Sequence, residues 1–283
     1  MKKKWVLILL GLFFANVVAY SVVFDLARPK FLEINFFDVG QGDSIFIETQ
    51  SGNQIIIDGG PDSTVLKKLN KEMPFYDRII DLMILTHADK DHLFGLLDVL
   101  KRYEIENIVW TGVKNESALC DEWIKLIEKE GSKIVIARAG ERIIVNGNPL
   151  VYIDIIHPDN VEDYSNLNDT SVITHLFFDK TSVLMTGDAT KKTDGSVLKW
   201  NLKSDVLKVA HHGSKDSTSL ELVEKVSPKA AVISVGENNY GHPSEEVFQN
   251  LKNSGIEVLR TDKYGDIKML SDGEEIKVYK KIN

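Results

Sequence analysis

Four side chains that commonly bind metal ions lie close together in the sequence. His87, Asp89, Asp91 and His92 follow directly on the apolar run 82–85, which has the length and composition of a buried strand. Imidazole nitrogens and carboxylate oxygens are suitable ligands for zinc, manganese or iron. Because a turn at a strand end can direct several side chains to one point, the segment predicts a metal centre rather than a solvated polar turn.

The elements that must position this segment can be read from the rest of the chain. Short apolar runs rich in β-branched side chains predict strands at 32–37, 44–48, 54–57, 82–85, 108–110, 133–137, 150–156, 171–178, 182–185, 206–209, 230–234 and 257–260. Helical patterns lie at 117–130, 220–226 and 245–253, and a further helix is expected to begin near Leu96 after a turn at Gly95. This mixture indicates an α/β fold with sheets covered by helices, in one domain of residues 30–283.

The N-terminus has the pattern of a membrane segment. Residues 5–24 carry no charge and follow the basic run Lys2–Lys4. Twenty residues at about 1.5 Å each would span roughly 30 Å of hydrocarbon, and the basic flank places the remainder of the chain outside. Small residues at Val17 and Ala19 leave a cleaved signal open. We expect residues 1–29 to be a single-pass anchor or signal with a short linker, with the catalytic domain outside the cell membrane or secreted.

Composition limits the possible classes of function. Acidic residues outnumber basic ones by 42 to 34, which gives a net charge of -8 and argues against a long nonspecific nucleic-acid surface. A nuclease is still compatible, because carboxylates that bind cations are counted as charges. The single cysteine, Cys120, excludes an intramolecular disulfide and a multi-cysteine zinc site. No protein partner is inferred.

A resemblance to a known family extends over most of the chain. The segment 87–92 resembles the His-x-His-x-Asp-His signature of the metallo-β-lactamase superfamily, with Asp89 where the second histidine usually stands. This departure is similar to the metallo-β-lactamase domain of ComEC, the bacterial DNA-uptake channel family. Further segments follow in that family's order, namely Asp38–Ser44, Ile56–Gly60, Asn168–Ser171, Leu184–Ala189, Leu207–Ser214, Tyr240–Pro243 and Arg260–Asp262. The match covers residues 31–270 and predicts a stand-alone ComEC-like domain.

The resemblance implies a four-layer αβ/βα sandwich with two divalent ions, zinc or manganese, at one edge between two central sheets. Asp188 would bridge the two ions. The implied ligands are His87, Asp89 and Asp188 for one ion, and Asp91, His92, Asp188 and either His211 or His212 for the other. The choice between the two histidines stays open, with a preference for His211 because it lies nearer the strand end.

Supporting residues are implied in the same way. Asp58 matches an aspartate that orients a ligand histidine. Asp43, in a glycine-rich segment, is either a turn residue or part of the site. His157 and His175 read as turn and strand residues, so the third histidine of many family members is missing. A residue near Asn168, or water, would replace it, which favours a harder ion such as Mn²⁺ or weakens the first site.

The expected nucleophile is a metal-bound hydroxide in a centre that contains Asp91 and Asp188, so no serine or cysteine nucleophile is required. His242 is a candidate proton donor to the leaving alkoxide, or else a loop residue that orders the turn before Pro243. Polar side chains near the motifs suit an anionic phosphate better than an apolar ester. They are Lys90, Ser214, Lys215, Ser217, Thr218, Asn238, Asn239 and Tyr240.

The leading hypothesis is a phosphodiesterase, and within that class a DNA nuclease that acts on single strands outside the membrane. A second hypothesis is an esterase for cell-wall phosphodiesters of the phosphorylcholine or teichoic-acid type, and a third is a lactone or β-lactam hydrolase. A non-enzymatic alternative is a membrane-tethered binding module whose metal site has decayed at Asp89 and near Asn168.

Overall fold

The computed structural model describes residues 2–27, 31–145 and 150–280, and its contacts divide the chain into units 1–30 and 31–283. The first unit contains one helix, α1 (Lys2–Ala27). Its window Lys3–Tyr20 has a mean hydropathy of 1.5 and is long and apolar enough to cross a membrane. The expected boundary between residues 29 and 30 involves residues outside the described part of the chain.

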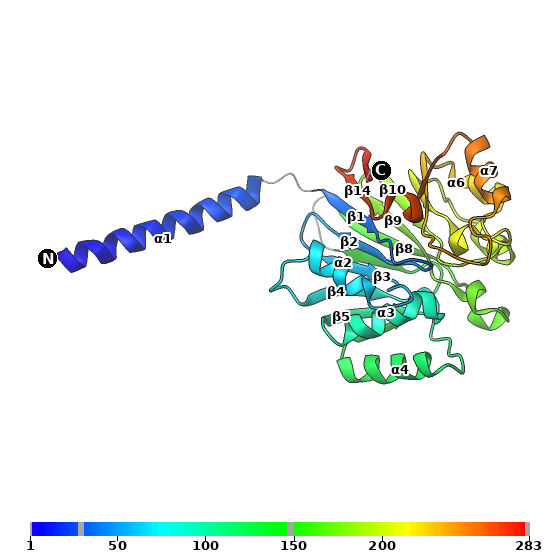
Figure 1. Ribbon diagram of the computed structural model, residues 1–283, viewed down its shortest axis with the longest axis horizontal. Helices are drawn as coiled ribbons and strands as arrows, with labels where there is room; N and C mark the ends of the chain where they lie inside the picture. Colours follow the sequence, from blue (N-terminus) through cyan, green and yellow to red (C-terminus); the bar gives the residue numbers. More distant parts are fainter. Residues whose placement is uncertain (1, 28–30, 146–149, 281–283) are drawn as a thin grey trace. The chain divides into compact units, whose positions relative to one another are not determined.

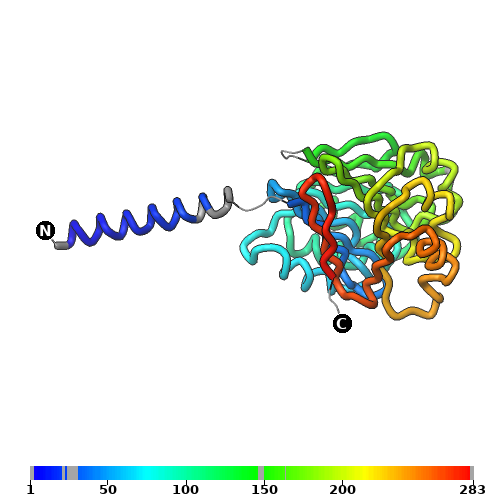
Figure 2. The backbone as a smooth tube through the Cα atoms, turned by 90° about the horizontal axis from the view of Figure 1, so that it is seen from above, coloured from blue at the N-terminus to red at the C-terminus, as the bar shows by residue number. Residues whose placement is uncertain are grey.

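Two β-sheets form the centre of the second unit. The strands of one sheet are β1 (Leu32–Phe36), β2 (Ile45–Glu48), β3 (Gln54–Ile57), β4 (Ile79–Ile84), β5 (Glu104–Trp110), β6 (Lys133–Ile136), β14 (Ile267–Ser271) and β15 (Ile276–Lys280). Those of the other are β7 (Arg142–Val145), β8 (Val151–His157), β9 (Ile173–Phe178), β10 (Thr181–Met185), β11 (Val206–Lys208), β12 (Ala230–Ile233) and β13 (Glu257–Arg260). Their orders are β15-β14-β1-β2-β3-β4-β5-β6 and β13-β12-β11-β10-β9-β8-β7. Figure 2 shows β14, in red, beside β1, in blue.

Helices cover the outer face of each sheet (Figure 1). The first sheet carries α2 (Thr64–Glu72), α3 (Lys90–Leu100) and α4 (Ala118–Glu130), and the second carries α5 (Asp194–Val197), α6 (Leu220–Val226) and α7 (Glu245–Asn253). The short helix α8 (Thr261–Tyr264) follows β13. One apolar core lies between the sheets and the others lie between each sheet and its helices. The predicted four-layer sandwich is therefore confirmed.

Parallel strands explain where a site can form. β3, β4, β5 and β6 run parallel, as do β10, β11, β12 and β13. The carboxyl ends of neighbouring parallel strands meet at one sheet edge, so the segments that follow them lie close together.

The start of α3 differs from the expectation. The helix begins at Lys90, with Asp89 at its N-cap, so Asp91 and His92 lie in its first turn. Gly95 is inside the helix and forms no turn before it. Glycine is required here for packing, because a Cβ at this position would collide with the carbonyl oxygen of Gly59. Glycine at this position allows the loop after β3 to approach the helix.

Helix α4 follows its prediction closely. Ser117 caps its N-terminus by accepting a hydrogen bond from the backbone N–H of Cys120. Gly131 ends it with a left-handed φ of 80°, a conformation that favours glycine. Cys120 is buried in the core beneath this helix.

Candidate metal centre

Segments that follow strands of both sheets bring four ligand side chains to one place. Asp91 and His92 come after β4, Asp188 after β10 and His212 after β11. We call these residues the four-residue group, in which one ligand atom from each side chain lies within 4.8 Å of all the others. The Nε2 atom of His212 is 3.2 Å from Asp91 Oδ2 and 3.4 Å from Asp188 Oδ2. The Nε2 atom of His92 is 3.3 Å from Asp188 Oδ1.

Buried atoms without partners indicate that these side chains fit a cation. His87 Nε2, His92 Nε2 and Asp188 Oδ1 are buried and form no hydrogen bond in the described part of the chain, although His92 Nε2 and Asp188 Oδ1 lie 3.3 Å apart. Each such atom costs roughly 1–3 kcal/mol when it stays unsatisfied. A divalent ion would satisfy the atoms that belong to the four-residue group, and its nitrogen and carboxylate donors suit zinc or manganese.

Asp58 holds His92 in the orientation that a ligand needs. The Nδ1–H group of His92 donates to Asp58 Oδ2 at 2.7 Å, which leaves Nε2 directed at the four-residue group. Asp58 is itself fixed, because its carboxylate accepts hydrogen bonds from the backbone N–H and the hydroxyl of Thr86 at 2.8 and 2.7 Å. The N–H of Gly59 donates to the carbonyl of His92 at 2.7 Å. This arrangement fits the orienting role expected for Asp58.

The two adjacent histidines differ in position. His212 is buried, and its Nδ1–H donates to the carbonyl of Ser234 at 2.8 Å, so that Nε2 faces the four-residue group. The side chain of His211 is 26% exposed, and its Nε2 is 3.8 Å from Asp188 Oδ2. The amide of Asn168 lies 3.4 Å from the same nitrogen. The structure therefore places His212 in the group, contrary to the preference for His211.

An unusual turn separates these two rings. His211 and His212 both have a left-handed φ, of 49° and 52°, which costs roughly 1–3 kcal/mol for a residue with a side chain. Buried hydroxyls hold the turn. Ser217 donates to the carbonyl of Ala210 at 2.8 Å, and Thr218 accepts from the N–H of Ala210 at 3.1 Å. Both hydroxyl residues thus stabilise the histidine turn through the backbone of Ala210.

A buried ion pair lies behind His212. Lys208 Nζ is 2.6 Å from Asp43 Oδ2, and both side chains are almost fully buried. The other oxygen of Asp43 is 3.5 Å from His212 Nδ1, and its backbone N–H donates to the carbonyl of Asp91 at 3.2 Å. Asp43 therefore supports the site and is more than a turn residue. Lys208 was not predicted, although a lysine inside the apolar run 206–209 was a signal.

Charges in the centre shift one another's pKa values. Burial lowers the pKa of His212, but Asp188, Asp43 and Asp91 outweigh it and raise that pKa to about 10. Burial likewise opposes the charge on His92, yet Asp188 and Asp58 raise its pKa well above the usual value. Burial raises the pKa of Asp188, but the histidines bring it well below its ordinary range. The ionised carboxylates therefore favour protonated histidines, and a metal ion would displace those protons.

The other predicted ligands are less closely assembled. His87 Nε2 is 3.5 Å from Asp89 Oδ2, and its Nδ1 lies 3.0 Å from the hydroxyl of Thr86. Asp89 has a side chain that is 42% exposed, and Asn168 lies beside His211. Around His87 and Asp89, no three ligand side chains reach the spacing of the four-residue group within the described ranges.

Two adjoining hollows open over the centre. The larger, of about 790 Å³, we call the metal hollow; it is lined by Gln41, Pro61, Asp89, Lys90, Asp91, Asn168, Asp188, His211, His212, Glu237, Asn238, Asn239, Tyr240 and His242. The smaller, of about 310 Å³, we call the side hollow; it is lined by Asn166, Thr190, Lys191, Lys192, His211 and Asp216. Ser214 and Lys215, expected either to contact substrate or to support the site, line neither of these hollows, and Ser214 is buried.

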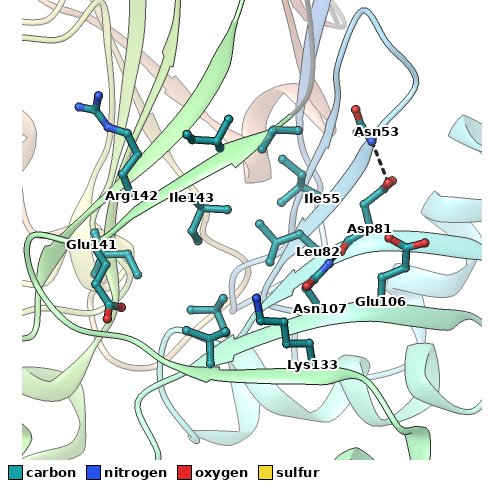
Figure 3. A pocket seen from close by; sticks show the side chains of 15 residues that line it. Asn53, Ile55, Asp81, Leu82, Glu106, Asn107, Lys133, Glu141, Arg142 and Ile143 are labelled. Atoms are coloured by element: carbon teal, nitrogen blue, oxygen red, sulfur yellow. Dashed lines mark hydrogen bonds between the residues drawn. The ribbon is translucent and has the colours of Figure 1, made fainter.

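A separate cleft of about 580 Å³ lies between the edge strands β6 and β7 (Figure 3). Its walls combine apolar side chains with the polar residues Asp81, Glu106 and Lys133, and Asn53 donates to Asp81 on one side. None of the described side chains grouped as potential metal ligands lines it. The metal hollow is therefore the candidate functional site.

Comparisons with known proteins agree with this geometry. The family model described as Metallo-beta-lactamase superfamily matches residues 37–237. The chain is 31% identical over 255 residues to ComE operon protein 3 of Bacillus subtilis (strain 168), covering 83% of this chain and 32% of that protein. It is 28% identical over 265 residues to Competence protein ComA of Neisseria gonorrhoeae, covering 87% of this chain and 34% of that protein. The chain thus spans about a third of the length of these relatives.

Solved structures share the fold. The metallo-beta-lactamase fold protein YhfI from Bacillus subtilis matches with a TM-score of 0.57 and 14% identity, covering 85% of this chain and 100% of that chain. CmlA, a diiron beta-hydroxylase from Streptomyces venezuelae, matches with a TM-score of 0.55 and 15% identity, covering 85% and 54%. At these identities the likeness concerns the fold alone.

The positions of the two adjacent histidines predict different effects on metal binding. His212→Ala should weaken the tightest-binding Mn²⁺ equivalent by more than about 100-fold, because removing a ligand should cost more than the 10- to 100-fold typical of its supporting residues. His211→Ala should spare that equivalent, because its ring lies outside the four-residue group. Isothermal titration of the two purified variants measures both. Equal losses in the two variants would contradict this assignment.

The buried ion pair predicts a non-additive stability effect. Lys208→Met should lower the free energy of unfolding by about 3–5 kcal/mol, because it leaves the Asp43 carboxylate buried without a counter-charge. Asp43→Asn combined with Lys208→Met should recover most of that loss, since no net charge remains buried. Denaturant unfolding of the metal-free wild type, the two single variants and the double variant measures these free energies. Additive losses would show that the pair is not coupled.

Proposed function

Because the chain belongs to the metallo-β-lactamase superfamily, we propose that this metal-dependent hydrolase is a phosphodiesterase, and within that class a nuclease for single-stranded DNA. One observation carries the proposal: the four-residue group, with its unpartnered buried atoms, lies at the wall of an open polar hollow. Two relatives with competence-related names support the narrower choice of DNA.

Divalent ions bound at this centre would supply Lewis acidity and bring the pKa of a coordinated water to roughly 7. The chain's own residues fix the geometry of the reaction. Asp58 keeps Nε2 of His92 directed at the four-residue group, while Asp188 reaches both His92 and His212. The metal-ligand atoms therefore have their orientation set before substrate binds, and so would the ions that a scissile phosphate meets at this wall of the hollow.

His242 lies on the wall of the same hollow. Burial, together with His211 and His212, lowers its pKa, so the ring is neutral at pH 7. Its Nδ1 atom is buried without a hydrogen-bond partner in the described residues. We assign to His242 a hydrogen bond to the leaving-group oxygen, because a neutral imidazole has one N–H to donate and can stabilise the negative charge that develops there.

The rest of the metal hollow favours an anionic substrate. Asn168 and Asn239 contribute amide groups and Lys90 contributes an ammonium group. Amides and cations hydrogen-bond phosphate oxygens well and offer little to an apolar ester. These groups thus support a phosphodiester over a lactone or β-lactam.

The purified full-length protein with Mn²⁺ should degrade single-stranded DNA, and His92→Ala should lower the rate by at least about 10³-fold because it removes a metal ligand. Gel analysis of an end-labelled oligonucleotide measures this. The matched control is His175→Gln, because His175 is a buried histidine bonded to Ser204 that lines neither hollow. This control should retain activity.

Equal activity of wild type and His92→Ala, independent of metal, would overturn the proposal. Cleavage of bis-p-nitrophenyl phosphate without cleavage of DNA would keep the phosphodiesterase and favour a cell-wall substrate. Less than about one equivalent of tightly bound metal at saturation would favour a binding module instead.

We further propose that α1 anchors the chain as a single span with the catalytic domain outside the membrane, or acts as a cleaved signal. Its apolar window and the lysines before it support this topology. In a bacterial host, the anchored form should fractionate with membranes, and protease added to spheroplasts should digest its domain. A cleaved form should instead be released as a shortened domain. Removal of residues 2–27 should yield a cytoplasmic protein resistant to that protease. A full chain found in the cytosol would contradict both forms of the proposal.

A further inference from the structure

The candidate site is longer than one phosphodiester requires. The metal hollow and the side hollow both include His211 in their walls, so they adjoin at this ring. The first has a volume of about 790 Å³ and the second of about 310 Å³. A substrate bound at the four-residue group can therefore extend past His211 into a second compartment.

An exposed aromatic ring lines the metal hollow. Tyr240 is 76% exposed although it lines this hollow. Its ring lies 5.7 Å from that of His242, which is 5.4 Å from His211, and His211 is 6.1 Å from His212. A line of rings thus leads from the open rim to the four-residue group. Such rings provide stacking surfaces for unpaired bases, whose faces are all aromatic.

The loop that carries Tyr240 is fixed from within. The Asn238 side-chain oxygen accepts from the backbone N–H groups of Tyr240 and His242 at 3.0 and 3.1 Å. Its amide nitrogen donates to the carbonyls of Gly236 and His242, both at 2.9 Å. Because one side chain makes all four bonds, the backbone that carries the exposed ring is ordered before substrate arrives, and less entropy is lost on stacking than from a mobile loop.

An available cation lies in the side hollow. Lys191 is already engaged, because its ammonium group donates to the carbonyl of Lys215 at 2.7 Å and lies 3.4 Å from Glu246. Lys192, also exposed, makes no side-chain hydrogen bond or ion pair within the described ranges. It is therefore the lysine of this hollow that can receive a phosphate without losing a partner.

We propose that the site binds an extended single strand of nucleic acid, with one base stacked on Tyr240 and a neighbouring phosphate held by Lys192. The strand passes His211, and the scissile phosphodiester lies at the four-residue group. This inference rests on the proposed function and names the substrate form of the same site. A cell-wall phosphodiester has no base for Tyr240, so the stacking contact distinguishes the two substrate classes.

The test compares two substrates on the full-length protein loaded with Mn²⁺. One is a fluorescein-labelled oligothymidylate, and the other is bis-p-nitrophenyl phosphate, which has neither a nucleobase nor a second phosphate. Tyr240→Ala should raise the KM for the oligonucleotide by about tenfold, in line with the loss of one base–aromatic stack, and Tyr240→Phe should restore it. Any change in KM for the small ester should be at least about fivefold smaller, because the ester reaches neither contact.

The contact of Lys192 with a phosphate is tested by the salt dependence of binding. Fluorescence anisotropy of the oligonucleotide should show that Lys192→Ala reduces the slope of log affinity against log salt by about 0.7, the value for one phosphate contact on a single strand. The matched controls are Tyr76→Ala, at the same 76% exposure, and Lys203→Ala, also at an exposed lysine. Neither lines a hollow, so both should behave as wild type.

The outcomes separate this inference from the proposed function. If wild type cleaves DNA and the Tyr240 and Lys192 variants match their controls, the strand path is overturned while the nuclease stands. Equal losses on both substrates would also overturn it, since they would indicate damage to the centre itself. If wild type cleaves the small ester and neither binds nor cleaves DNA, the nuclease fails and the strand path fails with it.

Discussion

The separation of the two sheets sets the distances on which the candidate centre depends. Asp91 and His92 follow a strand of the first sheet, whereas Asp188 and His212 follow strands of the second. No local turn can bring these pairs together, so the apolar core between the sheets must fix their spacing. The ligand atoms within 4.8 Å of one another are therefore a product of the whole sandwich.

The pair formed by Lys208 and Asp43 joins the sheets at this edge. Its net contribution to stability need not be large, because desolvation of two buried charges offsets much of their attraction. The effect of the pair on the positions of its neighbours is more important than its effect on stability. Asp43 also contacts His212 and the backbone of Asp91, so one carboxylate connects ligand-bearing segments of both sheets. The same logic applies to Asp58, which joins the loop after β3 to His92 in α3.

Much of this arrangement could be predicted from the sequence, because it depends on strand order and motif spacing. A polar cluster after a buried strand was enough to place His92 at a site, and the resemblance added Asp188. The choice between His211 and His212 could not be made, since it depends on two successive left-handed residues, a conformation that neither residue type predicts. The buried role of Lys208 depends on a partner far away in the sequence, and periodicity contains no information on such pairs.

Strand and helix boundaries show the same limit. Gly95 suggested a turn because glycine in a helical pattern weakens the prediction of a helix. Its actual function is tertiary, as it lets the backbone at Gly59 approach α3. Strands β7 and β15 were missed because charged or exposed side chains interrupt them at the sheet edges, and β14, which lies between β15 and β1, is interrupted by Lys268. Such strands are identified by their neighbours more than by their own apolar content.

The charge of the chain restricts how a nucleic acid could be bound. A net charge of -8 argues against an extended basic face, and duplex DNA relies on many phosphate contacts for its affinity. A single strand can use fewer charges, because its unpaired bases stack on aromatic rings. The hollows combine one exposed ring with a small number of lysines, and carboxylates such as Glu237 and Asp216 line the same walls. Local recognition of a few unpaired nucleotides is therefore the form of DNA binding that this acidic surface supports best.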